Sequence, residues 1–565
     1  MSTGAEPLAA EVRAVGSPRR DWAALAERLL VRAGERLNPI LVKEARQSLK
    51  SRQFVITFAL LLICGWLWSF FGLAIMGPEA SYTGKGPEMF MGYAVILAFP
   101  LLVIVPFWAF RSLASEQEDR TYELLSITAL APRQIISGKL GSACMQMIVY
   151  LSALSPCLAF TYMLRGIAFP TILFLIFYIV LGSLGLSVIG LLLGTVTSEK
   201  HWQVVLSVVL IVGLLWAFGL AASLCSSILW GLDLPVATAE FWQLNAAWLT
   251  GYGTYFALFF CAAVAQITFA SDNRSTRLRV VMAVQHACFV GWMGWAILAV
   301  APESAMLFVF LSFIGLHWYA MGALMTGEAP GLSPRVKRNL PQSFLGRAFL
   351  TWFNPGPGTG YLFAVCGALG ALMLVVLAVA FRDVLAMGMF SGRWSSGDSE
   401  RLLVFGVLAV AYLTAYLGVG LLVIRLLHRF GHVVMFLGVL IQLLLVIVGW
   451  GAPWLIEMTS VDNFYAGGEY SLLHVTDPFW TLIHVGADRS LPMETTALLI
   501  LVPLAALVVF MLNLPWVARE VGHVRMARPQ RVAQEDAELA AAIAPPQPRR
   551  ISPWDLVEPS SGQDL

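Results

Sequence analysis

Apolar runs of about 20 residues recur along the whole chain and constrain its fold more than any other feature. In hydrocarbon, every backbone N–H and C=O group needs a partner within its own segment, so such a run is typical of a helix that crosses a core about 30 Å thick. The sequence therefore predicts an all-α, polytopic integral membrane protein with about 12 transmembrane helices. We expect them near residues 54–76, 89–110, 140–164, 169–194, 203–230, 245–270, 280–301, 304–325, 360–381, 402–424, 433–456 and 492–516.

Composition excludes two other classes of protein. The chain is 58% hydrophobic and 12% charged, with a mean hydropathy of +0.76, whereas a water-soluble domain carries about 25% charged residues. Its 36 Lys and Arg nearly balance its 34 Asp and Glu, so the basic surplus of a nucleic-acid-binding protein is missing and we expect no nucleic-acid partner. The seven cysteines stand in apolar runs without zinc or redox spacing, and we interpret them as packing residues.

The connecting segments indicate an orientation, because short loops rich in Lys and Arg remain in the cytoplasm. If the spans alternate, five basic clusters fall on one side, whereas segments 77–88, 231–244 and 457–490 on the other side have few basic residues. The first twenty residues contain no apolar core typical of a cleaved signal peptide. We therefore expect a multi-pass protein of the cell membrane with both termini in the cytoplasm.

Changes in composition predict the organisation of the chain. Segment 326–359 is the longest polar interruption between spans and is rich in Pro and Gly, which favours a cytoplasmic linker. A division near residue 275, giving two sets of six spans, fits the span count equally well. We expect a cytoplasmic N-terminus with an interfacial helix (1–53), six spans (54–270), two further spans (271–325), the linker (326–359), four spans (360–516) and a disordered cytoplasmic tail (517–565).

The segment between the second and third spans, residues 111–139, carries most of the unusual chemistry. Acidic residues begin it, an apolar stripe including Tyr122 and Ile127 follows, and Ala131-Pro132 ends the pattern. This predicts a short amphipathic surface helix with its acids in the first turn, near the positive end of the helix dipole. Either the segment lies on the membrane without a partner, or it docks another protein.

A second polar element precedes the first span. Residues 35–54 read ERLNPILVKEARQSLKSRQF, which places Lys43, Arg46 and Lys50 on one face of a predicted helix that also contains Glu44. A basic stretch at this position is also what the charge rule predicts for any chain whose N-terminus is cytoplasmic.

Together, the two elements resemble a known family. EQEDRTYELLSITALAPRQIISGK, followed by a return to the membrane, is similar to the coupling segment of ABC type-2 permeases, and residues 35–54 resemble their interfacial connecting helix. The resemblance covers about residues 35–270, with Arg120 where the family often has Gly before the Thr. The family usually ends after about six spans, so the last six remain without a family counterpart.

The resemblance implies the membrane-spanning permease subunit of an ABC transporter, an exporter, coupled to a separate ATPase subunit. ATP and magnesium would bind that partner, because this chain has no phosphate loop: Gly138-Lys139 lacks the upstream glycine and continues into Leu140. We therefore expect no enzyme activity, cofactor or metal in this chain. The connection 425–432 is too short for a second coupling element, which favours a homodimer, or a heterodimer with a related permease.

The resemblance also implies roles for individual residues. Polar contacts to the ATPase, an apolar anchor and the return to the membrane would come from Glu116, Glu118, Asp119, Thr121, Glu123, Leu124, Leu125, Pro132 and Lys139. The interfacial helix would contribute Lys43, Glu44, Arg46 and Lys50.

Other patterns leave alternatives open. Asp119-Arg120 after the second span also occurs in secondary transporters of the major-facilitator kind, although the flanking glycines of that motif are missing. A non-transporting membrane scaffold is a third interpretation. Two histidines lie within predicted spans, His286 and His317, and are either interior packing residues or proton relays. In the outer segment 457–490, a metal or substrate contact is a candidate role for His474, Asp477 and His484.

Overall fold

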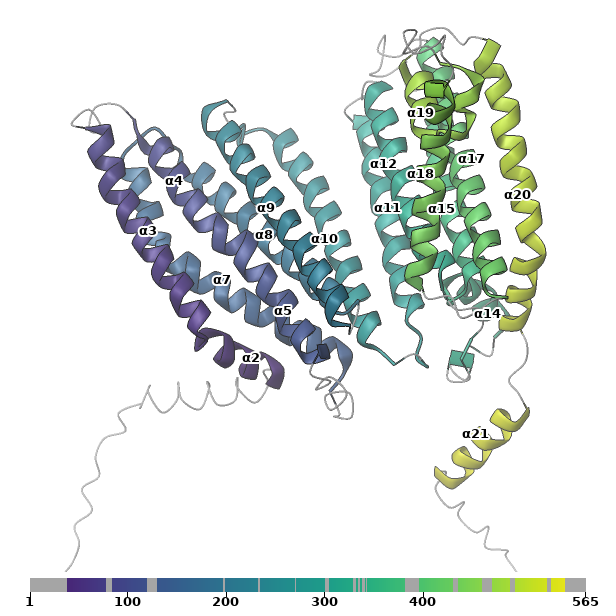
Figure 1. Cartoon of the computed structure of the whole chain (residues 1–565), viewed down its shortest axis with the longest axis horizontal. Coiled ribbons are helices and arrows are strands. Elements are labelled where there is room, and N and C mark those ends of the chain that lie inside the picture. The colour runs from purple at the N-terminus through teal and green to yellow at the C-terminus, as the bar shows by residue number, and fades with distance from the viewer. Residues whose placement is uncertain are drawn as a thin grey trace, which may run out of the picture. The chain divides into compact units, whose positions relative to one another are not determined.

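A computed structural model describes almost the whole predicted membrane region, and it is helical (Figure 1). The described residues are 38–77, 84–118, 130–196, 199–231, 234–269, 271–299, 304–328, 332–333, 336–337, 341, 343–381, 396–429, 435–459, 470–487, 493–525 and 530–543. Within these ranges there is no β-strand, and 12 helices are long and apolar enough to cross a membrane. The prediction of an all-α polytopic membrane protein is confirmed.

The chain folds into two compact units that divide within one helix, α10 (Ala239–Ile267). The first unit comprises Met1–Trp242 and Ala262–Ile267, and the second comprises Gln243–Cys261 and Thr268–Leu565. This division lies close to the alternative of two sets of six spans. The two spans expected at 271–325 belong to the same unit as the four spans that follow them.

In the first unit, the second span is the central helix. It runs without interruption through α4 (Gly86–Phe99), a π-helical turn (Pro100–Ile104) and α5 (Val105–Glu118). Pro100 lacks an N–H donor, so the helix widens there. The Ser183 hydroxyl donates a hydrogen bond to the Leu101 carbonyl in this turn. Around it pack α3 (Arg52–Met76), α7 (Pro132–Met163), α8 (Phe169–Gly194) and α9 (Lys200–Trp230), and α2 (Pro39–Leu49) packs on α7.

In the second unit, α17 (Ser396–Leu427) occupies the centre and contacts five other helices. Side chains of three of them donate hydrogen bonds to its backbone carbonyls: Tyr361 to Thr414 at 3.0 Å, Gln442 to Leu417 at 3.3 Å and Asn513 to Gly418 at 3.1 Å. Such bonds join helices inside a membrane, where apolar contact with lipid and with protein is similar. Besides most of α10, the other α-helices among the described residues of this unit are α11 (Ser275–Ala299), α12 (Ser304–Thr326), α14 (Phe344–Leu350), α15 (Pro357–Ala380), α18 (Met435–Thr459), α19 (Pro478–Ala487), α20 (Met493–Arg525) and α21 (Gln530–Ile543).

Two predicted boundaries differ from the structure around the 111–139 segment. The helix expected to end at 110 continues to Glu118, and the helix expected to start at 140 begins at Pro132. Both helices are longer than about 20 residues, the length that crosses the hydrocarbon core, so they continue beyond it. A second difference concerns the tail expected to be disordered, because residues 517–525 and 530–543 are helical. The segment predicted to be a linker, residues 326–359, contains α14 and a 3-10 turn at Thr351–Phe353.

Candidate functional site

The predicted interfacial helix is present as α2, and it is distinct from the helix of the first span. Asn38 caps its start, where its Oδ1 accepts a hydrogen bond from the Ile40 N–H at 3.0 Å, and Pro39 occupies the first helical position. Ser51 caps the next helix by accepting from the Phe54 N–H at 3.1 Å. The chain therefore forms a distinct helix of 11 residues before it enters α3.

Helix α2 packs against the first turns of α7, where two glycines allow a close approach. A Cβ atom on Gly138 would lie 2.8 Å from the Ile40 Cβ, and one on Gly141 would lie 2.7 Å from the Leu41 Cδ1. Two polar contacts add to this packing: the Ser48 and Ser142 hydroxyls lie 3.1 Å apart, and the Asn38 amide donates to the Gln134 carbonyl. The contact thus fixes α2 on α7 along most of its length.

Lys139 is the centre of this contact. It lies on α7, and only 1% of its side chain is exposed. Its ammonium Nζ lies 3.3 Å from the Glu44 Oε1 on α2, 3.0 Å from the Glu116 Oε1 on α5 and 3.0 Å from the Ser112 carbonyl oxygen on α5. A lysine ammonium has three N–H donors, and three oxygens surround this one. The side chain therefore joins three helices at one end of the first unit.

The arrangement meets the conditions under which a buried charge is tolerated. Removing an ammonium from water costs several kcal/mol unless opposite charges and hydrogen bonds replace the water. Here Glu44 and Glu116, with 13% and 15% of their side chains exposed, provide the negative charge, and the Ser112 carbonyl accepts the remaining hydrogen bond from the ammonium. Removing one partner would leave the others buried without compensation.

Two acids of the coupling segment lie elsewhere than predicted. Glu116 and Glu118 are in the last turn of α5 and not in the first turn of a separate helix. Carboxylates are unfavourable at a helix C-terminus because of the dipole, and cations compensate them: Lys139 pairs with Glu116, and Arg111 lies 3.7 Å from Glu118. The prediction was wrong because α5 continues past the end of its apolar run.

The remaining predicted residues divide into two groups. Pro132 occupies the first position of α7, preceded by Ala131 in an extended conformation, as expected for a residue before proline. Lys43, Arg46 and Lys50 are exposed on α2. Five predicted coupling residues lie outside the described part of the chain: Asp119, Thr121, Glu123, Leu124 and Leu125.

Sequence reasoning missed a second buried charge, in the second unit. The Arg279 side chain is fully buried, and its guanidinium donates to the Trp352 carbonyl (3.0 Å), the Thr359 hydroxyl (3.0 Å), the Glu328 carboxylate (2.6 Å) and the Gly356 carbonyl (3.0 Å). These bonds tie the start of α11 to the turn that precedes α15. The sequence signal was the Asn354-Pro355-Gly356-Pro357 run, which indicates a tight turn without naming its partner.

Glu520 of α20 joins the same turn. Its Oε2 accepts a hydrogen bond from the Gly358 N–H at 2.8 Å, and a Cβ on Gly358 would lie 2.5 Å from that oxygen. A side chain at position 358 would therefore displace the Glu520 carboxylate from this position. The cluster of Arg279, Glu328 and Glu520 fastens four segments of the second unit to one another.

The histidines that merited inspection have packing roles in the structure. The His317 Nδ1 lies 3.0 Å from the Tyr255 hydroxyl, and the Trp318 indole donates to the His286 Nδ1 at 3.2 Å. His484 stacks on Tyr470 with ring centroids 4.3 Å apart.

The other outer side chains are also engaged. Asp477 caps α19 by accepting from the Phe479 and Trp480 N–H groups at 2.9 and 3.0 Å, and His474 is buried beside Trp454. Within the described ranges, no three His, Cys, Asp or Glu side chains are grouped so as to hold a metal ion.

Comparison with known proteins identifies no relative of this chain. No protein-family model matches the chain, and neither a curated protein nor a solved structure matches it.

Proposed function

We propose that this chain is the membrane-spanning permease subunit of an ABC transporter of the type-2 superfamily, an exporter. The observation that carries the proposal is the ion pair cluster around Lys139. It brings together Glu44 of the interfacial helix, Glu116 at the start of the coupling segment and Lys139 at its end. Glu44 and Glu116 are 95 and 23 positions from Lys139 in the sequence. The resemblance assigned Glu116 and Lys139 to the coupling segment and Glu44 to the interfacial helix.

The cluster has the mechanical properties that such a role needs. A permease must convert the movement of its ATPase partner into a rearrangement of its spans. Helices α5 and α7 extend beyond the membrane core toward the coupling segment, and Lys139 joins both of them to α2, which leads directly into α3. A force applied at residues 119–131 would therefore reach the first three spans as one body.

Affinity purification from native membranes tests the proposal. We expect the tagged chain to co-purify with a phosphate-loop ATPase subunit, identified by mass spectrometry, and the preparation to hydrolyse ATP. The charge of two acids of the coupling segment is reversed in the variant Asp119→Lys with Glu123→Lys. This variant should retain at least about tenfold less of the ATPase subunit, because charged docking contacts are replaced by repulsion. The matched control is Glu88→Lys with Glu240→Lys, which reverses two acids outside the coupling segment.

The outcomes separate the three interpretations. Loss of the ATPase in the coupling variant alone supports the permease. A wild-type chain that transports in a proton or ion gradient without any ATPase would instead be a secondary transporter. A chain that retains other membrane proteins but neither an ATPase nor transport would be a scaffold.

A further inference from the structure

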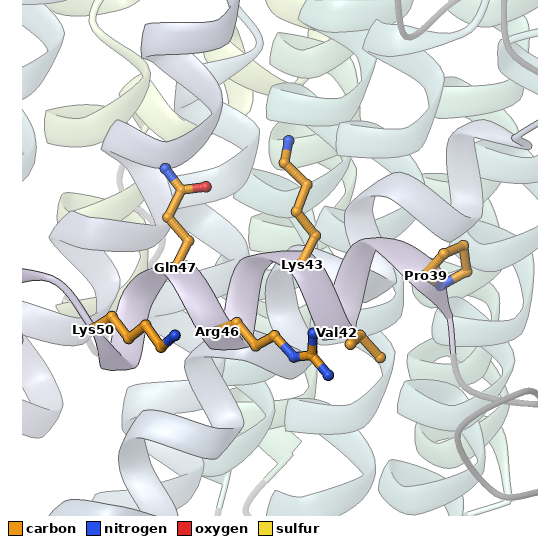
Figure 2. A pocket seen from close by; sticks show the side chains of 6 residues that line it. All are labelled: Pro39, Val42, Lys43, Arg46, Gln47 and Lys50. Carbon is orange, nitrogen blue, oxygen red and sulfur yellow. The ribbon is translucent and has the colours of Figure 1, made fainter. Parts of the chain in front are cut away.

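The face of α2 that points away from α7 forms a shallow hollow of about 550 Å³ (Figure 2). Three cationic side chains line it, Lys43, Arg46 and Lys50, together with the amide of Gln47 and the apolar side chains of Pro39 and Val42. All six residues come from this helix and its C-terminal cap. The hollow is therefore a property of the helix itself and does not depend on how the two units are arranged.

The charges on α2 are sorted between its two faces. Its one acidic residue, Glu44, is directed to α7, where it pairs with Lys139. The three cations lie at positions i, i+3 and i+7 on the other face, and among the described residues none of them has a carboxylate partner. Within the described part of the chain, the hollow thus presents three positive charges without a counter-charge.

The position of α2 places this charge at the boundary of the membrane. Lys50 caps α2, Ser51 caps α3, and the first span starts at Arg52. A helix of 11 residues is about 16 Å long, so each cation lies within about that distance of the hydrocarbon. Helix α2 also packs on the first turns of α7, a helix of 32 residues and therefore longer than the core is thick. Both relationships place the hollow at the depth of lipid headgroups.

We propose that this hollow binds the phosphate-bearing headgroup of an anionic phospholipid. The Arg46 guanidinium can pair with two phosphate oxygens, and Lys43 and Lys50 add point charges beside it. Gln47 is available to donate to a headgroup hydroxyl, and Val42 and Pro39 offer an apolar surface to the glycerol backbone. Anionic lipid would hold α2 against the membrane on one face while Lys139 holds it against α7 on the other. The proposal rests on the membrane spans and on α2, and is independent of the permease function.

Native mass spectrometry of the full chain in non-ionic detergent tests this binding. The probes are phosphatidylglycerol and phosphatidylcholine with the same acyl chains. We expect wild-type protein to retain phosphatidylglycerol preferentially. The variant Lys43→Gln, Arg46→Gln, Lys50→Gln should reduce that preference by at least about tenfold, since each cation near an anionic surface contributes roughly a fivefold gain. Arg46→Glu alone provides a second variant with a smaller loss.

A charge-matched control uses three exposed cations that lie at separate helix starts: Arg133→Gln, Lys200→Gln and Arg277→Gln. This variant should keep the preference, and all variants should elute as wild type in size exclusion. Equal retention of the two lipids by wild type, or an unchanged preference in the α2 variants, would overturn the proposal. Displacement of the lipid by an equal concentration of inorganic phosphate would reassign the hollow to free phosphate. If the α2 variants keep the lipid preference but no longer co-purify with a protein that the wild type retains, the hollow would be reassigned to a protein surface.

Discussion

The ammonium group of Lys139 lies 3.0 Å from the carboxylate of Glu116, and this ion pair joins the last turn of α5 to the second turn of α7. The chain therefore leaves one helix and enters the next at neighbouring points. Because Glu44 shares the same ammonium, the interfacial helix is tied to this junction. The segment between α5 and α7 is thus connected at both ends to a cluster of three joined helices, α2, α5 and α7.

Replacing Lys139 with methionine should destabilise the first unit. The substitution keeps the length of the side chain but leaves Glu44 and Glu116 mostly buried, close together and without a counter-charge. Breaking a buried pair in this way costs about 3–5 kcal/mol. We expect a clear fall in the apparent melting temperature measured by fluorescence-detected size exclusion.

A triple variant separates the charge effect from a packing effect. Adding Glu44→Gln and Glu116→Gln to Lys139→Met removes the repulsion, so most of the lost stability should return. A triple variant no more stable than Lys139→Met would show that the cost comes from packing around the side chain.

Adding a methyl group at Gly138 should separate α2 from α7. The new Cβ would lie 2.8 Å from both the Cβ and the Cγ2 of Ile40, which is buried and branched at Cβ, so it has little freedom to move. We expect Gly138→Ala to cost about 1–3 kcal/mol, as overpacking does, and to lower the protection of α2 amides in hydrogen exchange.

Two other glycines calibrate that measurement. Gly141→Ala should cost less, because its nearest neighbour is the flexible end of the Leu41 side chain. Gly213→Ala on α9 has no atom within 4 Å of the new Cβ, and should leave α2 unchanged. Equal protection of α2 in all three variants would contradict the packing described for this contact.

Arg279 and Arg277 offer a matched pair on one helix. Arg279 is fully buried and donates four hydrogen bonds, whereas Arg277 is exposed. A lysine has the same charge but cannot reproduce the planar fork of a guanidinium. Arg279→Lys should therefore lower the melting temperature of the second unit. Arg277→Lys should leave that temperature near the wild-type value, because a surface substitution changes the free energy of unfolding by no more than about 0.5 kcal/mol. Equal effects would contradict the assigned role of the buried guanidinium.

Both termini should report a cytoplasmic location. The basic clusters predict it, because Lys and Arg in short loops remain on that side. We expect a fluorescent protein fused to either end to fluoresce, and alkaline phosphatase at the same positions to be inactive. Active phosphatase at one end only would indicate an odd number of crossings.

The sequence predicted the repeating features of this chain better than its single contacts. Long apolar runs imposed the spans because hydrocarbon offers the backbone no other partner. The ends of α5 and α7 were misplaced because hydropathy falls where a helix leaves the lipid, not where it ends.

The sequence did not indicate which charged residues contact one another in the fold. Arg277 and Arg279 belong to one basic cluster, yet only the latter meets the turn before α15. Likewise, Glu44 resembled any acid on a surface helix until packing directed it to Lys139. Both contacts join residues far apart in the chain.

Site-specific photo-crosslinking tests the proposed function most directly. A photoreactive amino acid at Arg133, which is exposed in the first turn of α7 beside the coupling segment, should capture a phosphate-loop ATPase subunit in native membranes. The same probe at Lys85, the residue that precedes α4 at the opposite end of the second span, should capture none. A product with the ATPase from Arg133 alone is the result we predict. No ATPase product from Arg133, or equal products from both positions, would contradict the assignment of this chain as an ABC permease.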